Sequence, residues 1–407
     1  MSIFPKLHRP RNDGTVLLLG AGASFGASIS PKTPMNGTFV ASGKRMLGGR
    51  YDVFWRLLEK LGYRTTEDDS IDLENLYSRL HILSSGLWLN STEEYLNQFV
   101  EEVRWISPAE LCRSFIIDTL TPSSRNSINS PCKDHMRLFA SLKPGDTVIS
   151  LNYDLIADSA MFAARNWDER TGYGFTYLYP FAGDGDEIDE FSQVYGSTYI
   201  DLQSEQPDVA LLKLHGSIHW TAMQKGRTIN DIYGGSSVQQ MAQSTRPTAN
   251  WDLLFKPIRS LANSEYIGRS SINGLDSYME LGTALKESGQ ELPFKYTISD
   301  QFMPLIVPPS AFKLDDLGTT SAMSEMWSYA HEAISRAERI IFIGYSFPNT
   351  DLHLECLFQS ALLLNPRHAI DLQVVNPDEY VSNRLRGSMP KGSIVWAGKF
   401  IQEFEIM

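Results

Sequence analysis

Seven short apolar runs, spread along the whole chain, are the feature that most constrains how this sequence can fold. Each run is rich in β-branched residues and is continuously apolar rather than alternating in polarity. Such runs are typical of strands that are covered on both faces, as in a parallel sheet. The runs occupy residues 15–20, 147–152, 209–216, 304–309, 339–346, 371–377 and 393–398.

Segments with helical periodicity lie between these runs. Apolar residues share one face at 54–61 and again at 323–334, and Ser91 with Glu94 has the spacing of a capping box. Strands that alternate with helices predict an α/β chain with a Rossmann-like, doubly wound parallel sheet. Residues of about 45–140, which look mostly helical, and of about 220–303 depart from this alternation. We interpret both as insertions into a single domain over residues 1–407.

Polar turns marked by Gly or Pro follow five of the apolar runs. In an open parallel sheet the carboxyl ends of the strands meet at one edge, and ligands bind there. We therefore expect these five turns to converge on one site. They are GAGASFGAS at 20–28, Asn152 to Asp154, His215-Gly216, Tyr345 to Asp351, and Asn376 to Asp378.

The first of these turns is the strongest single motif. Gly20, Gly22 and Gly26 follow an apolar strand, and glycines in this position let a backbone approach a pyrophosphate closely. The spacing is one residue longer than the dehydrogenase fingerprint, and no acidic residue follows about 20 positions later. A hydride-transfer enzyme is therefore disfavoured, and a tight turn without a ligand is the alternative.

Three polar side chains at the next two strand ends are candidates for chemistry. Asn152 can hydrogen-bond a ribose hydroxyl or hold a water, and His215 can act as a neutral base near physiological pH. Asp154 either orients Asn152 or caps the following helix, and capping is the favoured role. A histidine at a strand end is more often structural than catalytic, and we assign His219 to structure.

The composition narrows the class of protein. The formal net charge of −12 disfavours nucleic-acid binding as the main task. Cys112, Cys132 and Cys356 lack Cys-x-x-Cys spacing, so we expect neither a disulfide framework nor a zinc ribbon. Residues 1–14 contain no apolar signal core, and no long uncharged apolar run occurs. We therefore expect a cytoplasmic protein without a membrane span.

Taken in order, these segments resemble the sirtuin (silent information regulator) family, and above all its bacterial sirtuin-like branch in anti-phage defence. The matching sirtuin segments are a phosphate-binding GAG turn, an Asn-x-Asp motif, the catalytic His-Gly, a G-[ST]-S turn and a ribose-contacting Asn. The order and approximate spacing agree over most of the predicted sheet but not over the two insertions. The residues that carry the resemblance are GAGAS at Gly20–Ser24, LNYD at Leu151–Asp154, KLHGSIHW at Lys213–Trp220, GYS at Gly344–Ser346 and VNPD at Val375–Asp378.

The chain also departs from the sirtuin pattern. Protein-deacylating sirtuins carry two Cys-x-x-Cys pairs after His-Gly, whereas residues 217–303 contain no Cys. Leu151 stands where those sirtuins have a Gln, and Ser30–Met35 replaces their Asp-Phe-Arg segment. These departures disfavour acyl-lysine chemistry, and we expect no zinc or other metal.

The resemblance implies that the chain cleaves the nicotinamide–ribose bond of NAD, with water as acceptor and ADP-ribose as product. It implies that Asn152 positions the ribose and a water, and that His215 is the general base. NAD is then a substrate rather than a resident cofactor. The residues that the resemblance assigns to NAD binding are Gly20, Ala21, Gly22, Ser24, Asp154, Gly344, Ser346 and Asn376.

The resemblance also implies regulation, because unrestrained NAD hydrolysis kills the host cell. It points to NAD depletion in abortive infection, switched on by homo-oligomer assembly or by a HerA-type hexameric ATPase partner. The two insertions are the candidates for such contacts. Two other functions stay open: an NAD- or ADP-ribose-binding sensor or scaffold without turnover, and an NAD-dependent protein deacylase or ADP-ribosyltransferase.

Overall fold

The chain is described from a computed structural model, whose central element is a six-stranded parallel sheet. The sheet has the order β3-β2-β1-β7-β8-β9, and every neighbouring pair is parallel. Its strands are β1 (Thr15–Leu19), β2 (Thr147–Ser150), β3 (Ala210–Lys213), β7 (Arg339–Ile343), β8 (Asp371–Val375) and β9 (Ser393–Gly398). The structure describes residues 14–66, 70–85, 108–165, 167, 172–173, 208–224, 251–255, 302–307, 321–348, 351–367, 370–388, 393–398, 400–404 and 406.

The strand order reverses at β1, so the sheet has a topological switch point between β1 and β7. Along the sequence, β1, β2 and β3 follow one another toward one edge of the sheet, and β7, β8 and β9 follow one another toward the other edge. Leu17 at the middle of β1 pairs with Val148 on β2 and with Ile341 on β7. Doubly wound α/β sheets bind ligands in the crevice at such a point. The predicted Rossmann-like α/β sheet is confirmed.

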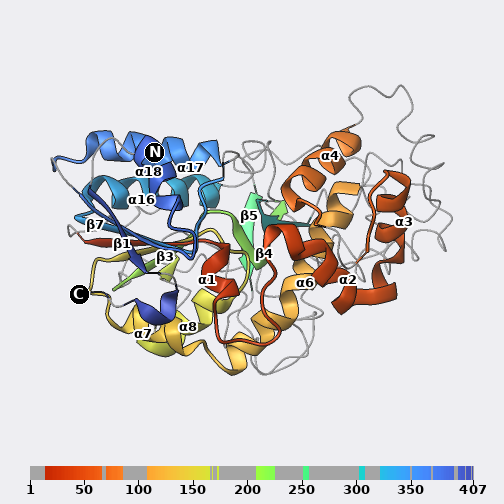
Figure 1. Cartoon of the computed structure of the whole chain (residues 1–407), viewed down its shortest axis with the longest axis horizontal. Coiled ribbons are helices and arrows are strands. Elements are labelled where there is room, and N and C mark those ends of the chain that lie inside the picture. The colour runs from red at the N-terminus through yellow and green to blue at the C-terminus, as the bar shows by residue number, and fades with distance from the viewer. Residues whose placement is uncertain are drawn as a thin grey trace.

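Helices cover both faces of this sheet (Figure 1). Helices α16 (Ser321–Arg336) and α17 (Leu352–Leu364) lie on one face, and α7 (Lys133–Ala140) and α8 (Ile156–Arg165) lie on the other. The expected stripe on α16 is core: Met323, Met326, Ala330 and Ile334 are buried with the strands, and Trp327 packs against them. Helix α18 (Val381–Ser388) packs on β9. We call the sheet with these helices the sheet lobe.

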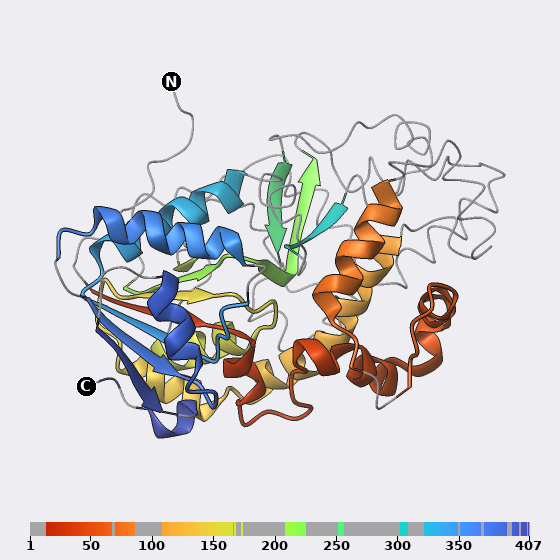
Figure 2. The same cartoon turned by 45° about the horizontal axis from the view of Figure 1, so that its top comes forward.

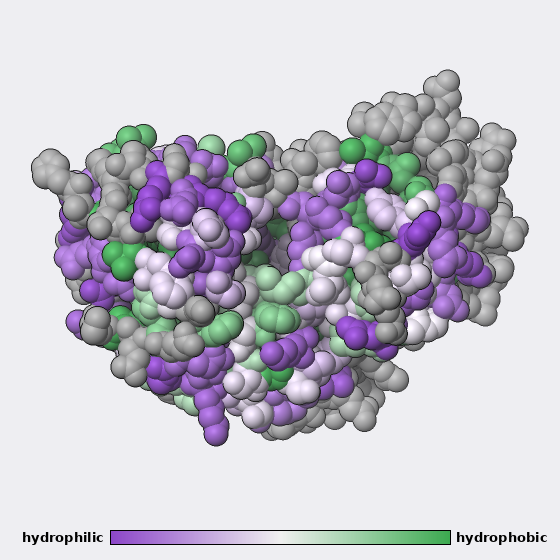
Figure 3. All heavy atoms as spheres, viewed as in Figure 1, coloured by the Kyte–Doolittle hydropathy of each residue, from purple (hydrophilic) through white to green (hydrophobic). Residues whose placement is uncertain are grey.

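A second group of helices, which we call the helical lobe, lies beside the sheet (Figure 2). An aromatic core holds its elements together. The ring centroid of Phe115 lies 4.9 Å from that of Phe54 and 5.5 Å from that of Tyr51. The space-filling view is hollowed between the two lobes (Figure 3). The elements are η1 (Asn36–Thr38), α2 (Phe39–Leu47), η2 (Gly48–Tyr51), α3 (Asp52–Lys60), α4 (Leu73–Ser85) and α6 (Pro108–Asn129).

The run at 304–309 is the one apolar run that does not join the parallel sheet. Its first three residues belong to β6 (Phe302–Ile306), which pairs antiparallel with β4 (Gly216–Gln224). On its other side β4 pairs antiparallel with β5 (Trp251–Phe255). Leu305 and Val307 pack in the core of the sheet lobe, whereas Ile306 packs in the core of the helical lobe. Burial on both faces therefore explains the continuous apolar pattern, and that pattern does not specify a parallel partner.

The predicted boundaries of the two insertions, at about 45–140 and 220–303, stay predictions. Within the range 45–140 the described residues are mostly helical, and α7 packs on α8 in the sheet lobe rather than with α4 and α6. Within 220–303 the described residues are strands. The predicted capping box at Ser91 and Glu94 lies outside the described residues. None of the helices in the described part of the chain is long and apolar enough to cross a membrane.

The central position of β1 predicts how the sheet responds to truncation of a side chain. Leu17 is fully buried between β2 and β7, whereas Val395 on the edge strand β9 is 50% exposed. We expect Leu17→Ala to lower the free energy of unfolding by about 3 kcal/mol, because it leaves a cavity. Val395→Ala, the control, changes it by less than about 0.5 kcal/mol. Urea unfolding followed by circular dichroism measures both, and equal effects would contradict the central role of β1.

Candidate functional site

A pocket of about 230 Å³ lies at the carboxyl edge of the sheet, at the switch point. The turns after β1, β2, β3 and β7 line one side of it, so four of the five predicted turns converge as expected. Seven of the ten predicted site residues line the pocket: Gly20, Ala21, Asn152, Asp154, His215, Gly344 and Ser346. Gly22, Ser24 and Asn376 lie outside this lining.

The opposite wall of the pocket comes from the helical lobe and from the segment before it. Asn36 ties this segment to the start of α4, because its side chain accepts a hydrogen bond from the Leu73 backbone N–H and donates one to Asp72. The segment Ser30–Met35 is the one that replaces the Asp-Phe-Arg segment of sirtuins, whereas no pattern in the sequence marks Phe39, Leu73 or Leu120 as part of a site. The wall consists of Thr33, Pro34, Met35, Asn36, Phe39, Leu73, Glu74 and Leu120.

The Asn152 side chain is held in one orientation. Its amide nitrogen donates to the Gly20 carbonyl oxygen and to the Ser24 hydroxyl, both at 2.9 Å. The side chain is almost completely buried, and its Oδ1 makes no hydrogen bond to any described residue. The amide N–H groups are thus committed to the turn after β1, and Oδ1 is the group that Asn152 can offer to a ligand.

Asp154 is linked to the Asn152 side chain through Ser24. Its carboxylate accepts a hydrogen bond from the Ile156 backbone N–H at 3.0 Å and so satisfies a free donor at the start of α8, from the position before the N-cap residue Leu155. Ser24 hydrogen-bonds the same carboxylate while it accepts from Asn152. Burial raises the pKa of Asp154, against the opposing effects of the Lys213 ammonium and these two hydrogen bonds. Ser24 therefore links Asp154 to Asn152 and does not line the pocket.

His215 is fixed by the backbone around it. It lies two residues after the end of β3, its carbonyl accepts from the Val307 N–H at 2.7 Å, and its side chain is 7% exposed at the pocket. The ring of Tyr153 lies 6.3 Å from that of His215, and the Tyr153 hydroxyl donates to the Val307 carbonyl at 2.7 Å. Gly216 has a φ of 77°, and a Cβ there would lie 1.9 Å from the Leu305 carbonyl oxygen. Only glycine fits this position.

Two glycine turns pack backbone against backbone beside the pocket. The Gly20 N–H donates to the Ile343 carbonyl at 2.9 Å, and the Gly22 N–H donates to the Gly344 carbonyl at 2.8 Å. A Cβ on Gly344, whose φ is 63°, would lie 2.1 Å from the Ala23 nitrogen. Gly22 therefore joins the two turns, while the Ala21 N–H makes no hydrogen bond to any described residue. Ala21 is the residue of this turn whose backbone donor stays open to a ligand.

The turn after β8 reaches the pocket only indirectly. The Asn376 side chain donates to the Tyr345 carbonyl at 3.0 Å and accepts from the Asp378 N–H at 2.9 Å. Tyr345 lines the pocket, and its hydroxyl donates to Asp351 at 2.7 Å. Burial raises the pKa of Tyr345, so the phenol stays neutral and remains a donor. Asn376 thus shapes the turn after β7 from outside the pocket.

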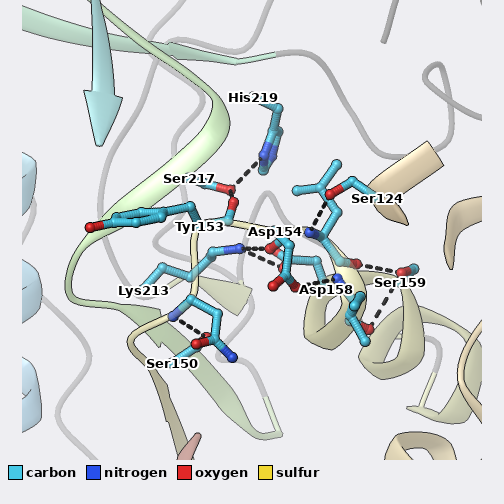
Figure 4. Close-up of polar contacts among 12 residues, drawn as sticks. Ser124, Ser150, Tyr153, Asp154, Asp158, Ser159, Lys213, Ser217 and His219 are labelled. Atoms are coloured by element: carbon cyan, nitrogen blue, oxygen red, sulfur yellow. Dashed lines mark hydrogen bonds and ion pairs between the residues drawn. The ribbon is translucent and has the colours of Figure 1, made fainter. Parts of the chain in front are cut away.

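A buried polar network lies under the turns that carry Asn152 and His215 (Figure 4). Lys213 and Asp158 are fully buried and form an ion pair at 2.7 Å. The Tyr173 hydroxyl donates to Asp158 at 2.5 Å and lies 3.4 Å from Nε2 of His219. Nδ1 of His219 lies 2.9 Å from the Ser217 hydroxyl, so the predicted structural role of His219 agrees with its surroundings.

Comparison with models of known protein families and with curated proteins finds no match for this chain. The resemblance to sirtuins therefore stays an expectation that depends on the chain's own sequence motifs. Among the residues that the structure describes, no group of three or more His, Cys, Asp or Glu side chains is placed to hold a metal ion.

The tight fit at Gly216 gives a prediction. We expect Gly216→Ala to lower the free energy of unfolding by about 3 kcal/mol, because a Cβ meets the Leu305 carbonyl and the positive φ is strained. Gly62→Ala is the matched control, since Gly62 has a φ of 84° but open space around it, and should cost about 1 kcal/mol. Urea unfolding compares them, and equal costs would contradict the packing at Gly216.

The buried His219 makes stability depend on pH. Burial, and next the Lys213 ammonium, lower the pKa of His219 well below its usual 6.5. The unfolded chain therefore binds a proton below pH 6.5 that the folded chain rejects, and stability falls as the pH falls. Between pH 7 and pH 5.5 the wild type should lose about 1 kcal/mol relative to His219→Gln. Urea unfolding of both proteins at the two pH values tests this, and a constant difference would contradict it.

Proposed function

We propose that this chain hydrolyses the nicotinamide–ribose bond of NAD to nicotinamide and ADP-ribose. The observation that carries the proposal is that Asn152 and His215, from different strands, meet in one pocket with the turns after β1 and β7. A binding site at the switch point of a doubly wound sheet is the usual place for a dinucleotide. The order of the motifs along the chain supports a sirtuin-like use of that site.

The chemistry asks little of a general acid. The bond between ribose C1′ and the pyridinium nitrogen breaks with its electron pair going to the ring, so nicotinamide leaves as a neutral molecule. The ribose passes through an oxocarbenium-like state, as in glycoside hydrolysis. A water oxygen then bonds C1′, and His215 as a neutral imidazole accepts the proton that the water loses. ADP-ribose is the second product.

The contacts of Asn152 suit it to orient the nucleophile. Its amide nitrogen is committed to Gly20 and Ser24, and its Oδ1, which bonds no described residue, can accept a hydrogen bond from a ligand hydroxyl or a water. This fixed acceptor positions a water or a ribose hydroxyl relative to His215. Preorganised hydrogen-bonding groups of this kind avoid reorganisation at the moment of reaction.

Phosphate binding falls to the two glycine turns in this proposal. The Ala21 N–H is open to a ligand, and Ser346 lines the pocket on the facing turn. The Arg384 guanidinium donates to the Ser346 carbonyl at 2.9 Å at this rim, and its charge is paired with Asp378 at 3.1 Å. Among the described lining residues no Lys or Arg side chain enters the pocket itself, so backbone donors carry most of this contact.

In the cell, this activity would deplete NAD, and the proposal extends to anti-phage defence on the basis of the sirtuin-like motifs. Activation by homo-oligomer assembly or by a HerA-type ATPase partner belongs to the same proposal. The helical lobe supports a regulatory link, because Phe39, Leu73 and Leu120 form one wall of the pocket. A shift of this lobe on assembly would change the shape of the site.

NAD consumption by the purified chain, with products separated by chromatography, tests the proposal. We expect nicotinamide and ADP-ribose in equal amounts, and we expect Asn152→Ala and His215→Ala to lower kcat at least 100-fold. His331→Ala on α16 and Asn129→Ala at the end of α6 are matched controls outside the site. Both controls should keep wild-type activity.

The assay is run alone and with the product of the neighbouring gene, because activation by a partner is part of the proposal. Calorimetric titration with NAD accompanies it. Binding of NAD without turnover under both conditions would show a sensor or scaffold and would contradict hydrolysis. Turnover that survives both substitutions would remove Asn152 and His215 from the mechanism.

A further inference from the structure

We propose that Lys213 is a positioning residue, whose buried ammonium holds the turn that carries Asn152 in place against the strand end that carries His215. The catalytic meaning of this role rests on the proposed function, whereas the structural restraint itself does not. Lys213 is the last residue of β3, two positions before His215. It is fully buried at the end of an otherwise apolar strand.

The contacts of Lys213 reach across to the neighbouring strand end. Its ammonium donates to the Asp154 carbonyl oxygen at 2.5 Å and to the Asp158 carboxylate at 2.7 Å (Figure 4). The Asp154 carbonyl lies in the turn two residues beyond Asn152, and Asp158 lies in the first turn of α8. One side chain thus joins β3, the Asn152 turn and α8.

The start of β4, which follows His215, also hydrogen-bonds the turn that carries Asn152. The Tyr153 carbonyl accepts from the Ile218 N–H at 3.0 Å and from the Ser217 hydroxyl at 3.3 Å. Residues on both sides of His215 therefore hold consecutive carbonyls of the Asn152 turn. The Lys213 ammonium bonds that of Asp154, and the Ser217 hydroxyl and the Ile218 N–H bond that of Tyr153. The relative placement of Asn152 and His215 depends on these two clamps.

Folding alone does not require a lysine here. A buried ion pair costs desolvation on both partners, and apolar residues of similar volume often serve stability as well or better. The flanking residues Leu211, Leu212 and Leu214 are buried and apolar, so a methionine would suit the same strand. What an apolar side chain cannot supply is a donor for the buried Asp154 carbonyl, and without one the turn is free to shift.

The test separates stability from positioning with a pair of variants. Lys213→Met alone strands the Asp158 charge and should lower Tm and kcat together. Lys213→Met combined with Asp158→Asn removes the whole pair, and Asn can still accept from the Tyr173 hydroxyl. We expect this double variant to regain most of the Tm while kcat stays 10- to 100-fold below wild type and KM changes less than about threefold.

Arg113→Met combined with Glu110→Gln is the matched control. This pair is also buried, at 3.3 Å in the helical lobe, but lies away from the strand ends. It should alter Tm and leave kcat unchanged. If the Lys213 double variant regains both Tm and kcat, Lys213 serves folding alone and the proposal is overturned.

Hydrogen–deuterium exchange tests whether Lys213 restrains the Asn152 turn, and it does not require that the chain hydrolyse NAD. In the Lys213 double variant we expect faster exchange across 147–160 and unchanged exchange across 108–129. Faster exchange in a chain that never hydrolyses NAD would defeat the proposed function and leave the restraint standing. Unchanged exchange across 147–160 would overturn the restraint whether or not the chain hydrolyses NAD.

Discussion

The contact between the turns after β1 and β7 is the constraint on which the site depends. Two backbone hydrogen bonds, from Gly20 to Ile343 and from Gly22 to Gly344, close these turns together at the switch point. Side chains on either glycine, or on Gly344, would hold them apart. The Gly20 carbonyl then accepts from Asn152 and sets the direction of its Oδ1. The orientation of the candidate catalytic amide thus follows from a contact that needs three glycines.

This contact also changes what the glycine motif means. The spacing Gly20-x-Gly22 suggests a phosphate-binding turn, and its position after β1 agrees with that reading. Yet the Gly20 N–H is already bonded to Ile343 at the end of β7, and the Gly22 N–H to Gly344 in the turn after it, whereas the Ala21 N–H makes no hydrogen bond to any described residue. Glycine at these positions is required first for close packing of two backbones. A motif match alone cannot separate that requirement from ligand binding.

The sequence predicts the sheet well because continuous apolar runs and the turns that end them are local signals. Six of the seven runs form the parallel sheet, and the turns at Asn152 and His215 meet as strand order requires. The seventh run, at 304–309, contributes instead to the antiparallel sheet of β4, β5 and β6. There Leu305 and Ile306 pack in two different cores, which depends on tertiary packing and not on local sequence. The sequence also could not predict that Phe39, Leu73 and Leu120 form a wall of the pocket. An apolar helix residue has the same spacing whether it packs in a core or lines a pocket. The role of Lys213 depends on a carbonyl 59 residues away in the chain and has no local signal.

The site joins two opposing physical demands. The proposed hydrolysis needs one water beside Asn152 and His215, yet a reactive oxocarbenium-like ribose requires that bulk water be kept out. The polar side of the pocket is held by strand ends and by the hydrogen bonds to the Tyr153 and Asp154 carbonyls. The apolar side comes from a separate lobe that is tied to the pocket segment through Asn36 and Leu73. Because this wall comes from another lobe, water access could change without moving Asn152 and His215, so in the proposed function control of the activity would act through the wall.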